Sequence, residues 1–111
     1  MNKLYRLKKS QDFSRIIKKR QSVVNKDFVL YYEPQMLSHA RVGISVSKKL
    51  GKAVVRNKIK RQVRMMVNHI VDLEEPYDFV IIVRQHYCQQ AYLDNEQSFA
   101  NLYKQFLKKR G

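Results

Sequence analysis

Residues 47–64 read Ser-Lys-Lys-Leu-Gly-Lys-Ala-Val-Val-Arg-Asn-Lys-Ile-Lys-Arg-Gln-Val-Arg and form a strongly cationic stretch. Eight of the residues from Lys48 to Arg64 are Lys or Arg, and no Asp or Glu occurs between Pro34 and Val71. After Gly51, aliphatic and cationic residues recur at helical spacing. Such a helix has an apolar face for the protein core and a cationic face beside it. We therefore expect it to bind a polyanion as well as its own sheet.

The composition limits the class of protein. The chain of 111 residues predicts a single domain spanning 1–111, with a basic lead-in at 1–9, and 44% apolar residues supply a core. The net charge is +14, so the chain repels itself unless it binds something negative, with nucleic acid the first candidate and an anionic membrane the second. No apolar run approaches membrane-spanning length, and no signal peptide is expected. The single cysteine, Cys88, excludes an internal disulfide and favours a reducing cytoplasm.

Periodicity predicts seven secondary-structure elements. Apolar residues at helical spacing indicate the helices, and runs of β-branched and aromatic residues indicate the strands. Ser10 is expected to be the N-cap of the first helix. The expected elements are a helix at about 11–19, strands at 22–24, 28–32 and 41–46, a helix at about 53–71, a strand at 78–83, a loop or short turn at 84–93 and a helix from 94. The order αβββαβα indicates an α+β fold, a two-layer sandwich of helices against one sheet.

The strand at 41–46 has two unlike faces. Val42, Ile44 and Val46 share one face, which we expect in the core. The other face is small, polar or charged, so we expect it to stay partly open. It carries Arg41, Gly43 and Ser45.

The cationic helix presents its charges in columns. Arg56, Lys60 and Arg64 lie in one row, and Asn57 and Arg61 lie beside them, further from the apolar stripe. The row repeats about every 6 Å, which is close to the phosphate spacing of a nucleic-acid strand. The ordinary alternative is a solvated helix face, but such faces usually interleave Glu with Lys, and this one has no acid. The pattern predicts phosphate contacts without choosing between RNA and DNA.

A long motif connects this stretch to a known family. The pattern Lys-x-Gly-x-Ala-Val-x-Arg-Asn-x-x-Lys-Arg-x-x-Arg is met at every fixed position from Lys49 to Arg64. It resembles the hallmark of the bacterial ribonuclease P protein component, and the likeness covers about residues 5–108. Further matching segments are 7–9, 12–13, 28–31 and 78–84.

The resemblance implies a fold and a function. The implied fold is similar to domain 2 of ribosomal protein S5, with an unusual left-handed β-α-β crossover through the basic helix. The implied function is that of the protein subunit of ribonuclease P, which binds the catalytic RNA and the 5′ leader of precursor tRNA and assists the Mg²⁺-dependent endonucleolytic removal of the leader. The catalytic centre and its Mg²⁺ are then expected in the RNA subunit. No catalytic or metal-binding residue, and no required protein partner, is expected for this chain.

The resemblance also implies roles for individual residues. The set facing RNA from the basic helix and its lead-in is Lys49, Lys52, Arg56, Asn57, Lys60, Arg61 and Arg64. The cleft for the leader, between the first helix and the sheet, is expected to contain Phe13, Ile17 and Tyr31, to which the open strand face adds Arg41 and Ser45. Phe13 and Tyr31 are suited to stacking on bases, although Phe13 alternatively packs the first helix onto the sheet.

Three positions depart from the pattern of the family. Ile17 stands where many relatives have an aromatic residue, Arg20 stands where a glycine is common, and Met65 stands where Glu is common. Ile17 weakens the case for base stacking at its own position. The rest of the motif is unaffected.

Other residues give weaker signals. The three histidines lack metal-ligand spacing with each other or with Cys88, which has no activating base near it in sequence. The acids Asp72, Glu74, Glu75 and Asp78 fit a solvated loop better than a metal site. Two alternatives remain open: a general RNA-binding or ribosome-associated domain without a role in tRNA processing, and a stand-alone nuclease. The nuclease would need a carboxylate cluster or a histidine pair, and no convincing arrangement of either is present in the sequence.

Overall fold

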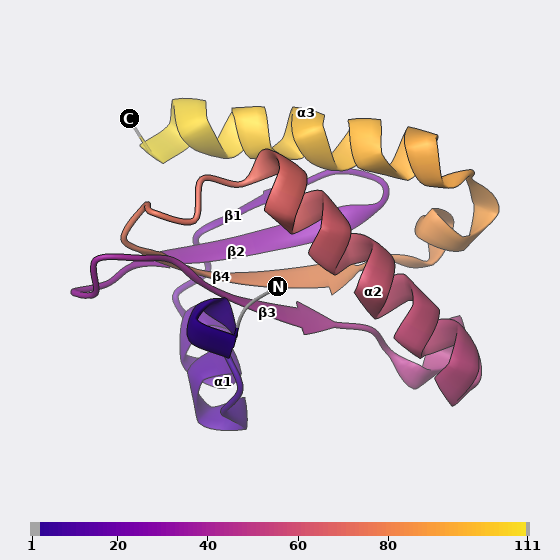
Figure 1. Cartoon of the computed structure of the whole chain (residues 1–111), viewed down its shortest axis with the longest axis horizontal. Coiled ribbons are helices and arrows are strands. Elements are labelled where there is room, and N and C mark those ends of the chain that lie inside the picture. The colour runs from indigo at the N-terminus through magenta and orange to yellow at the C-terminus, as the bar shows by residue number, and fades with distance from the viewer. Residues whose placement is uncertain (1–2, 111) are drawn as a thin grey trace.

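The computed structural model describes residues 3–110 and places three α-helices around one sheet (Figure 1). The elements are η1 Lys3–Tyr5, α1 Ser10–Lys18, β1 Ser22–Val24, β2 Phe28–Pro34, β3 Arg41–Ser45, η2 Lys48–Leu50, α2 Ala53–Ile70, β4 Tyr77–Val83, η3 Gln85–Gln89 and α3 Tyr92–Arg110. This order confirms the expected αβββαβα arrangement. Within the described range, no helix is both long enough and apolar enough to span a membrane.

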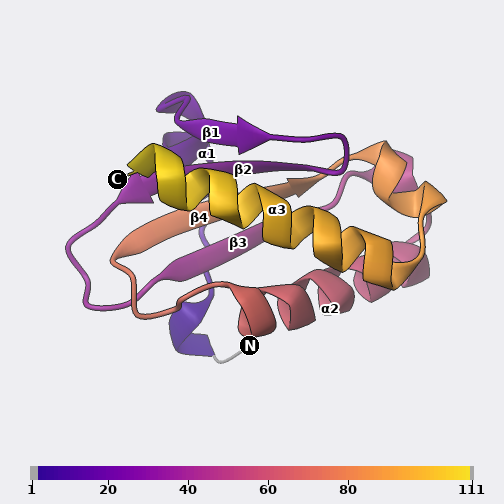
Figure 2. The same cartoon turned by 90° about the horizontal axis from the view of Figure 1, so that it is seen from above.

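The sheet has the strand order β1-β2-β4-β3, so the last strand in sequence lies between two earlier ones. β2 pairs antiparallel with both β1 and β4, whereas β3 and β4 are parallel. α2 connects the parallel pair. Seen from the side of α2 and α3 (Figure 2), the chain passes from β3 to β4 in the left-handed sense. The expected left-handed crossover is confirmed, against the usual preference for right-handed connections.

The main core lies between the sheet and the pair α2 and α3. Ile59, Val63 and Met66 of α2 are buried, as their spacing predicts, whereas Val55 is 44% exposed. In Figure 1 the first turns of α2 extend beyond the ends of the strands, which explains the exposure of Val55. α3 docks through Phe106, whose ring lies 5.0 Å from that of Phe79 in an edge-to-face contact. Truncating a buried Phe of this kind costs about 3–5 kcal/mol.

α1 packs alone on the opposite face of the sheet and adds a partial layer to the sandwich (Figure 1). Ile16 is fully buried there together with Leu7 and Val80. Phe13 and Ile17 are partly buried against this second cluster. α1 therefore covers only part of its face of the sheet.

The start of the chain is more ordered than its composition predicts. The backbone N–H of Leu7 donates to the carbonyl of Val42 at 2.9 Å, Arg6 bridges to the same strand, and Leu7 is 5% exposed. Ser10 is the first helical residue of α1 and not its N-cap, which is Lys9 and makes no side-chain capping bond. The expectation of Ser10 as a cap is therefore wrong.

The end of the chain also differs slightly from expectation. α3 begins at Tyr92, two residues before the predicted start, and the expected loop before it contains η3. The continuous apolar run at 79–83 predicts a strand buried on both faces. Ile82 is only partly buried, so β4 is not covered on both faces along its whole length.

Candidate nucleic-acid interface

The cationic flank of α2 has the two-column arrangement that its spacing predicts. Arg56, Lys60 and Arg64 are half-buried beside the apolar stripe, whereas Asn57 and Arg61 are exposed. Among the residues that the structure describes, no Asp or Glu forms an ion pair with any of these cations. The flank therefore presents uncompensated positive charge.

The turn before α2 brings further cations to its start. The Ser47 hydroxyl accepts the backbone N–H of Lys49 at 3.2 Å, and this capping bond orders η2. Gly51 follows with φ 144°, a conformation that side chains rarely adopt. Lys52 is the N-cap of α2, whose first turn contains no acid, so exposed Lys49 and Lys52 lie near the positive end of the helix dipole. Arg56 is partly held by the Gly51 carbonyl, to which its Nε donates at 3.2 Å.

A pocket of about 200 Å³ joins the flank of α2 to the segment before α1. Its lining contains four cations, Arg6, Lys8, Lys60 and Arg64, and no acid. The apolar residues of the lining are Leu7, Phe13, Val42 and Ile44. Burial lowers the pKa of Arg64, and the positive charge of Arg6 lowers it further. An anion in this pocket would relieve that repulsion.

Arg6 and Lys8 are functional candidates that the sequence analysis missed. Residues 1–9 were expected only as a basic lead-in, so their cations received no place in the fold. The available signal was the alternation of Leu7 with cations on both sides, which is typical of an extended segment against a sheet. In the structure Leu7 is buried.

Strand register defines three rows of side chains on the face that carries α1, because paired residues share a face. The rows are Arg41–Asp78–Glu33, Gly43–Val80–Tyr31 and Ser45–Ile82–Val29. α1 lies over the first two rows, where Arg15 contacts Asp78 and Phe13 contacts Gly43. The third row stays partly exposed. We call Ser45, Ile82 and Val29 the open row.

Phe13 packs directly on the sheet. A Cβ added to Gly43 would lie 2.3 Å from Cζ of Phe13, so only glycine permits this contact. The alternative reading of Phe13, as a packing residue, therefore holds, yet the ring also lines the pocket beside Lys60 and Arg64. Ile17 and Tyr31 are partly buried in the same cluster as Ile82 of the open row, and the row of Tyr31 lies next to the open row. Three of the predicted cleft residues are thus brought together.

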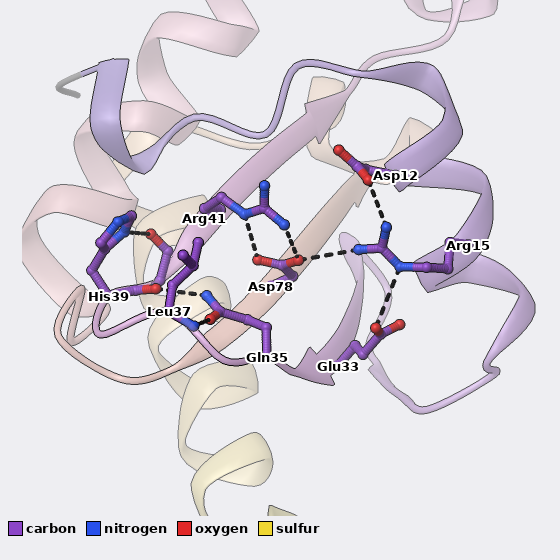
Figure 3. A network of polar contacts seen from close by, with 9 residues as sticks. Asp12, Arg15, Glu33, Gln35, Leu37, His39, Arg41 and Asp78 are labelled. Atoms are coloured by element: carbon purple, nitrogen blue, oxygen red, sulfur yellow. Dashed lines mark hydrogen bonds and ion pairs between the residues drawn. The ribbon is translucent and has the colours of Figure 1, made fainter.

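Arg41 occupies a different place from the one predicted (Figure 3). Its Nε and Nη2 donate to the two oxygens of fully buried Asp78 at 3.0 and 2.7 Å. Hydrogen bonding to Asp78 raises the pKa of Arg41. Arg41 and Ser45 lie two rows apart, so the structure does not bring them together. The guanidinium of Arg41 is paired with Asp78 and is therefore not a free cation of the cleft.

The same network ties α1 to the sheet (Figure 3). Arg15 donates to Asp78 at 3.2 Å and to Glu33 at 3.3 Å. Within α1 it also donates to Asp12 at 2.6 Å, and this hydrogen bond is the main reason that the pKa of Arg15 is raised. α1 is therefore held on the sheet by the ion pairs of Arg15 with Glu33 and Asp78 and by the buried side chain of Ile16.

The acids after α2 do not gather into a metal site. Asp78 is paired with arginines, Glu75 pairs with Arg110, and Glu74 accepts from the Tyr5 hydroxyl. Nowhere in residues 3–110 do three side chains among His, Cys, Asp and Glu come together in a way that could hold a metal ion.

Comparison with known proteins agrees with the motif in α2. The family model described as Ribonuclease P matches residues 1–107. The ribonuclease P protein component of Streptococcus gordonii is 45% identical over 105 residues, covering 94% of this chain and 87% of that protein. The protein component of Mesoplasma florum is 43% identical and covers 92% of this chain and 94% of its own length.

Solved structures show the same fold. The Staphylococcus aureus RNase P protein aligns with a TM-score of 0.81 at 43% identity, covering 90% of this chain and 93% of that chain. The RNase P protein from Thermotoga maritima aligns with a TM-score of 0.80 at 30% identity, covering 90% and 96%. Motif, fold and relatives agree over nearly the whole chain, and the chain therefore belongs to the family of ribonuclease P protein components.

Proposed function

We propose that this chain binds the catalytic RNA of ribonuclease P through the flank of α2 and the 5′ leader of precursor tRNA along the open row. One observation carries the proposal. The acid-free flank of α2 continues, through the pocket of Arg6 and Arg64, to Phe13 beside the partly exposed sheet face. Phosphates of a structured RNA fit the flank, and a single strand fits a shallow apolar surface with Tyr31 at its border.

We assign the Mg²⁺ of the reaction to the RNA partner. Mg²⁺ prefers oxygen ligands, mostly carboxylates, phosphates and water. The flank of α2 offers cations and one amide, Asn57, so its donor set does not fit a magnesium site in the protein alone. The role of this chain is then to position RNA and to lower repulsion between RNA strands near the reaction.

Reconstitution tests the proposal. The chain is combined with a cognate ribonuclease P RNA and a precursor tRNA at low Mg²⁺, and the cleavage rate is compared with that of the RNA alone. We expect faster removal of the leader with the protein and no cleavage by the protein alone. If added protein changes neither leader binding nor cleavage, the proposal fails.

A second comparison separates this function from general RNA binding. The affinity of the reconstituted complex is measured for precursor tRNA and for the same tRNA without its leader. Leader binding along the open row predicts tighter binding of the precursor. Equal affinities would favour a general RNA-binding domain instead.

A further inference from the structure

A second cationic surface extends from the C-terminal end of α3, past the start of β1, to the residues that end and follow α1. We call it the α1/α3 end and define it by five exposed cations: Lys18, Lys19, Arg20, Lys108 and Lys109. The Nζ of Lys109 donates to the backbone carbonyl of Ser22 at 2.9 Å, which brings the end of α3 to the start of β1. In Figures 1 and 2, the C-terminal end of α3 and the first turns of α2 lie at opposite ends of the molecule.

The charge of this surface is uncompensated. Within residues 3–110, none of its five cations takes part in an ion pair with an acid. Two acids lie close by in the fold, but Glu33 pairs with Arg15 and Glu75 pairs with Arg110. Cations at helix C-termini are common because they complement the helix dipole. Charge alone therefore does not establish a binding site.

Arg20 supplies the independent observation. It has φ 57°, the single positive φ of a non-glycine residue in the described part of the chain. It follows the C-cap Lys19, and its N–H donates to the Ile17 carbonyl at 3.1 Å, which is the usual position of a glycine after a helix. An arginine there strains the backbone, and its exposed side chain makes no ion pair with any residue in 3–110 that would offset the strain. Strain kept at a surface position indicates a role for the side chain outside the fold.

We propose that the α1/α3 end is a second RNA-binding surface, which contacts backbone phosphates, and that Arg20 is its central contact. Arginine suits phosphate because its planar fork donates two hydrogen bonds. Arg20 lies two residues before Ser22, whose register partner is Tyr31 at the border of the open row. The open row itself reaches β1 at Val24, the register partner of Val29, one row away from Ser22. RNA that turns from the open row towards the C-terminal end of α1 would therefore meet this surface. The inference builds on the proposed function and adds a contact at the opposite end from the start of α2.

RNA fits this surface better than a membrane does. A helix or loop that binds a membrane normally adds exposed apolar side chains to its cations. Among the described residues, Val24 at the far end of β1 is the nearest large exposed apolar side chain, and it stands alone there. The others belong to other segments of the chain and are Leu4, Met36, Leu37, Val54, Val55, Met65 and Leu93. The phosphates can come from the RNA subunit or from the part of the leader beyond the sheet face.

The substitution Arg20→Gly separates function from folding. Glycine adopts φ 57° without strain, so we expect Arg20→Gly to keep the parent Tm or raise it by a few degrees. RNA binding should weaken, and the slope of log affinity against log salt should become shallower by about 0.7–0.9 for one lost phosphate contact. Lys26→Gln is the matched control, because Lys26 is an exposed cation at the other end of the β1–β2 hairpin. It should leave the slope unchanged.

The source of the phosphate is identified by three binding measurements. Parent, Arg20→Gly and Lys26→Gln are titrated with the RNA subunit alone, and the reconstituted complexes are then titrated with precursor tRNA carrying a short or a long leader. A shallower slope with the RNA subunit assigns the surface to that RNA. A shallower slope confined to the long leader assigns it to the leader.

Three outcomes overturn the inference. Arg20→Gly with parental slopes for every RNA shows that the surface does not contact RNA. The same proteins are also titrated with phosphatidylserine-containing vesicles, and a loss of binding confined to these vesicles would replace RNA by a membrane. An equal loss in Lys26→Gln shows an effect of net charge alone. If the proposed function itself is wrong, the result differs from these outcomes, because the parent protein would then neither bind the RNA subunit nor change cleavage.

Discussion

At the scale of single residues, close contacts make two positions intolerant of change. Gly43 is buried beneath the ring of Phe13, and the pocket beside that ring leads to Lys60 and Arg64. Asp27 is a fully buried carboxylate that lies 2.7 Å from Nδ1 of His86. Gly43 determines where the ring of Phe13 lies, and Asp27 makes the stability of the protein depend on pH.

Gly43→Ala should destabilise the protein by about 1–3 kcal/mol, the usual cost of overpacking. The new methyl group would lie 2.3 Å from Cζ of Phe13, so the ring or the strand must move. Urea unfolding measures the free energy. Phe13→Leu combined with Gly43→Ala is the control, and the pair should lose less stability than the sum of the single changes. If Gly43→Ala keeps the free energy of unfolding of the parent, α1 can shift to accommodate the methyl group without loss of stability.

Asp27 should make stability fall in acid. Burial alone would raise its pKa, but the polar side chains around the carboxylate, Ser98, His86 and Gln90, together outweigh burial and lower it. The folded pKa is therefore below that of the unfolded chain, so the stabilisation is present above about pH 3.9 and is lost as the pH falls through the folded pKa.

Urea unfolding between neutral and acidic pH checks this expectation. Asp27→Asn should be less stable than the parent at neutral pH and should lose less stability in acid. Exposed Asp94 provides the control through Asp94→Asn. Parallel curves for the parent and Asp27→Asn would contradict the assignment.

At the scale of elements, α1 is held by a charge network that local sequence patterns do not reveal. The pattern of apolar residues predicts α1, α2 and the strands nearly to their ends, because helical and strand periodicity are local. Asp78 lies 37 residues from Arg41, and this pairing depends on which strands become neighbours. The sequence placed Ser45 on a partly open strand face but missed Ile82 and Val29 of the open row for the same reason, since Ile82 belongs to an apolar run that resembles a fully buried strand.

The cationic flank was the most predictable part of the site. Arg56, Asn57, Lys60, Arg61 and Arg64 lie in the predicted columns, since the columns follow from helix geometry alone. Arg6 and Lys8 could not be placed in this way, because their position depends on a bridge to β3.

Arg41→Met should destabilise the fold by about 3–5 kcal/mol, because it leaves a buried carboxylate without its main partner. Arg15→Met removes a partner that is 42% exposed and should cost at most about 1 kcal/mol. Urea unfolding compares the two. Adding Asp78→Asn to Arg41→Met should recover part of the loss. Equal costs for the two arginines would show that Asp78 does not depend on its bidentate partner.

Arg61→Ala and Arg64→Ala test the flank of α2. Each should weaken RNA binding and make its salt dependence shallower by about one phosphate contact, a slope change of about 0.7–0.9. Lys58→Ala is the control on the same helix, because Lys58 lines the groove towards Tyr92 of α3. An unchanged slope for Arg61 and Arg64 would exclude direct phosphate contact.

At the scale of the whole molecule, the net charge of +14 links folding to RNA binding. Like charges destabilise a compact chain, and a polyanion that binds only the folded form stabilises it. At a free RNA concentration about 100 times Kd, the gain is about 2.7 kcal/mol. Tm should therefore rise with added cognate RNA, and high salt should remove the rise. A Tm that is independent of RNA would contradict this linkage.

The strand order has a consequence for how the chain is made. β4 lies between β2 and β3, yet it follows both in sequence and ends at Val83. While the ribosome has released only the residues before β4, β3 has no strand to pair with, and the apolar sides of β2 and β3 are unprotected. The sheet can therefore form completely only after β4 has been synthesised. A nascent chain stalled before Tyr77 should be sensitive to proteolysis and should recruit chaperones. One stalled after α3 should be protected.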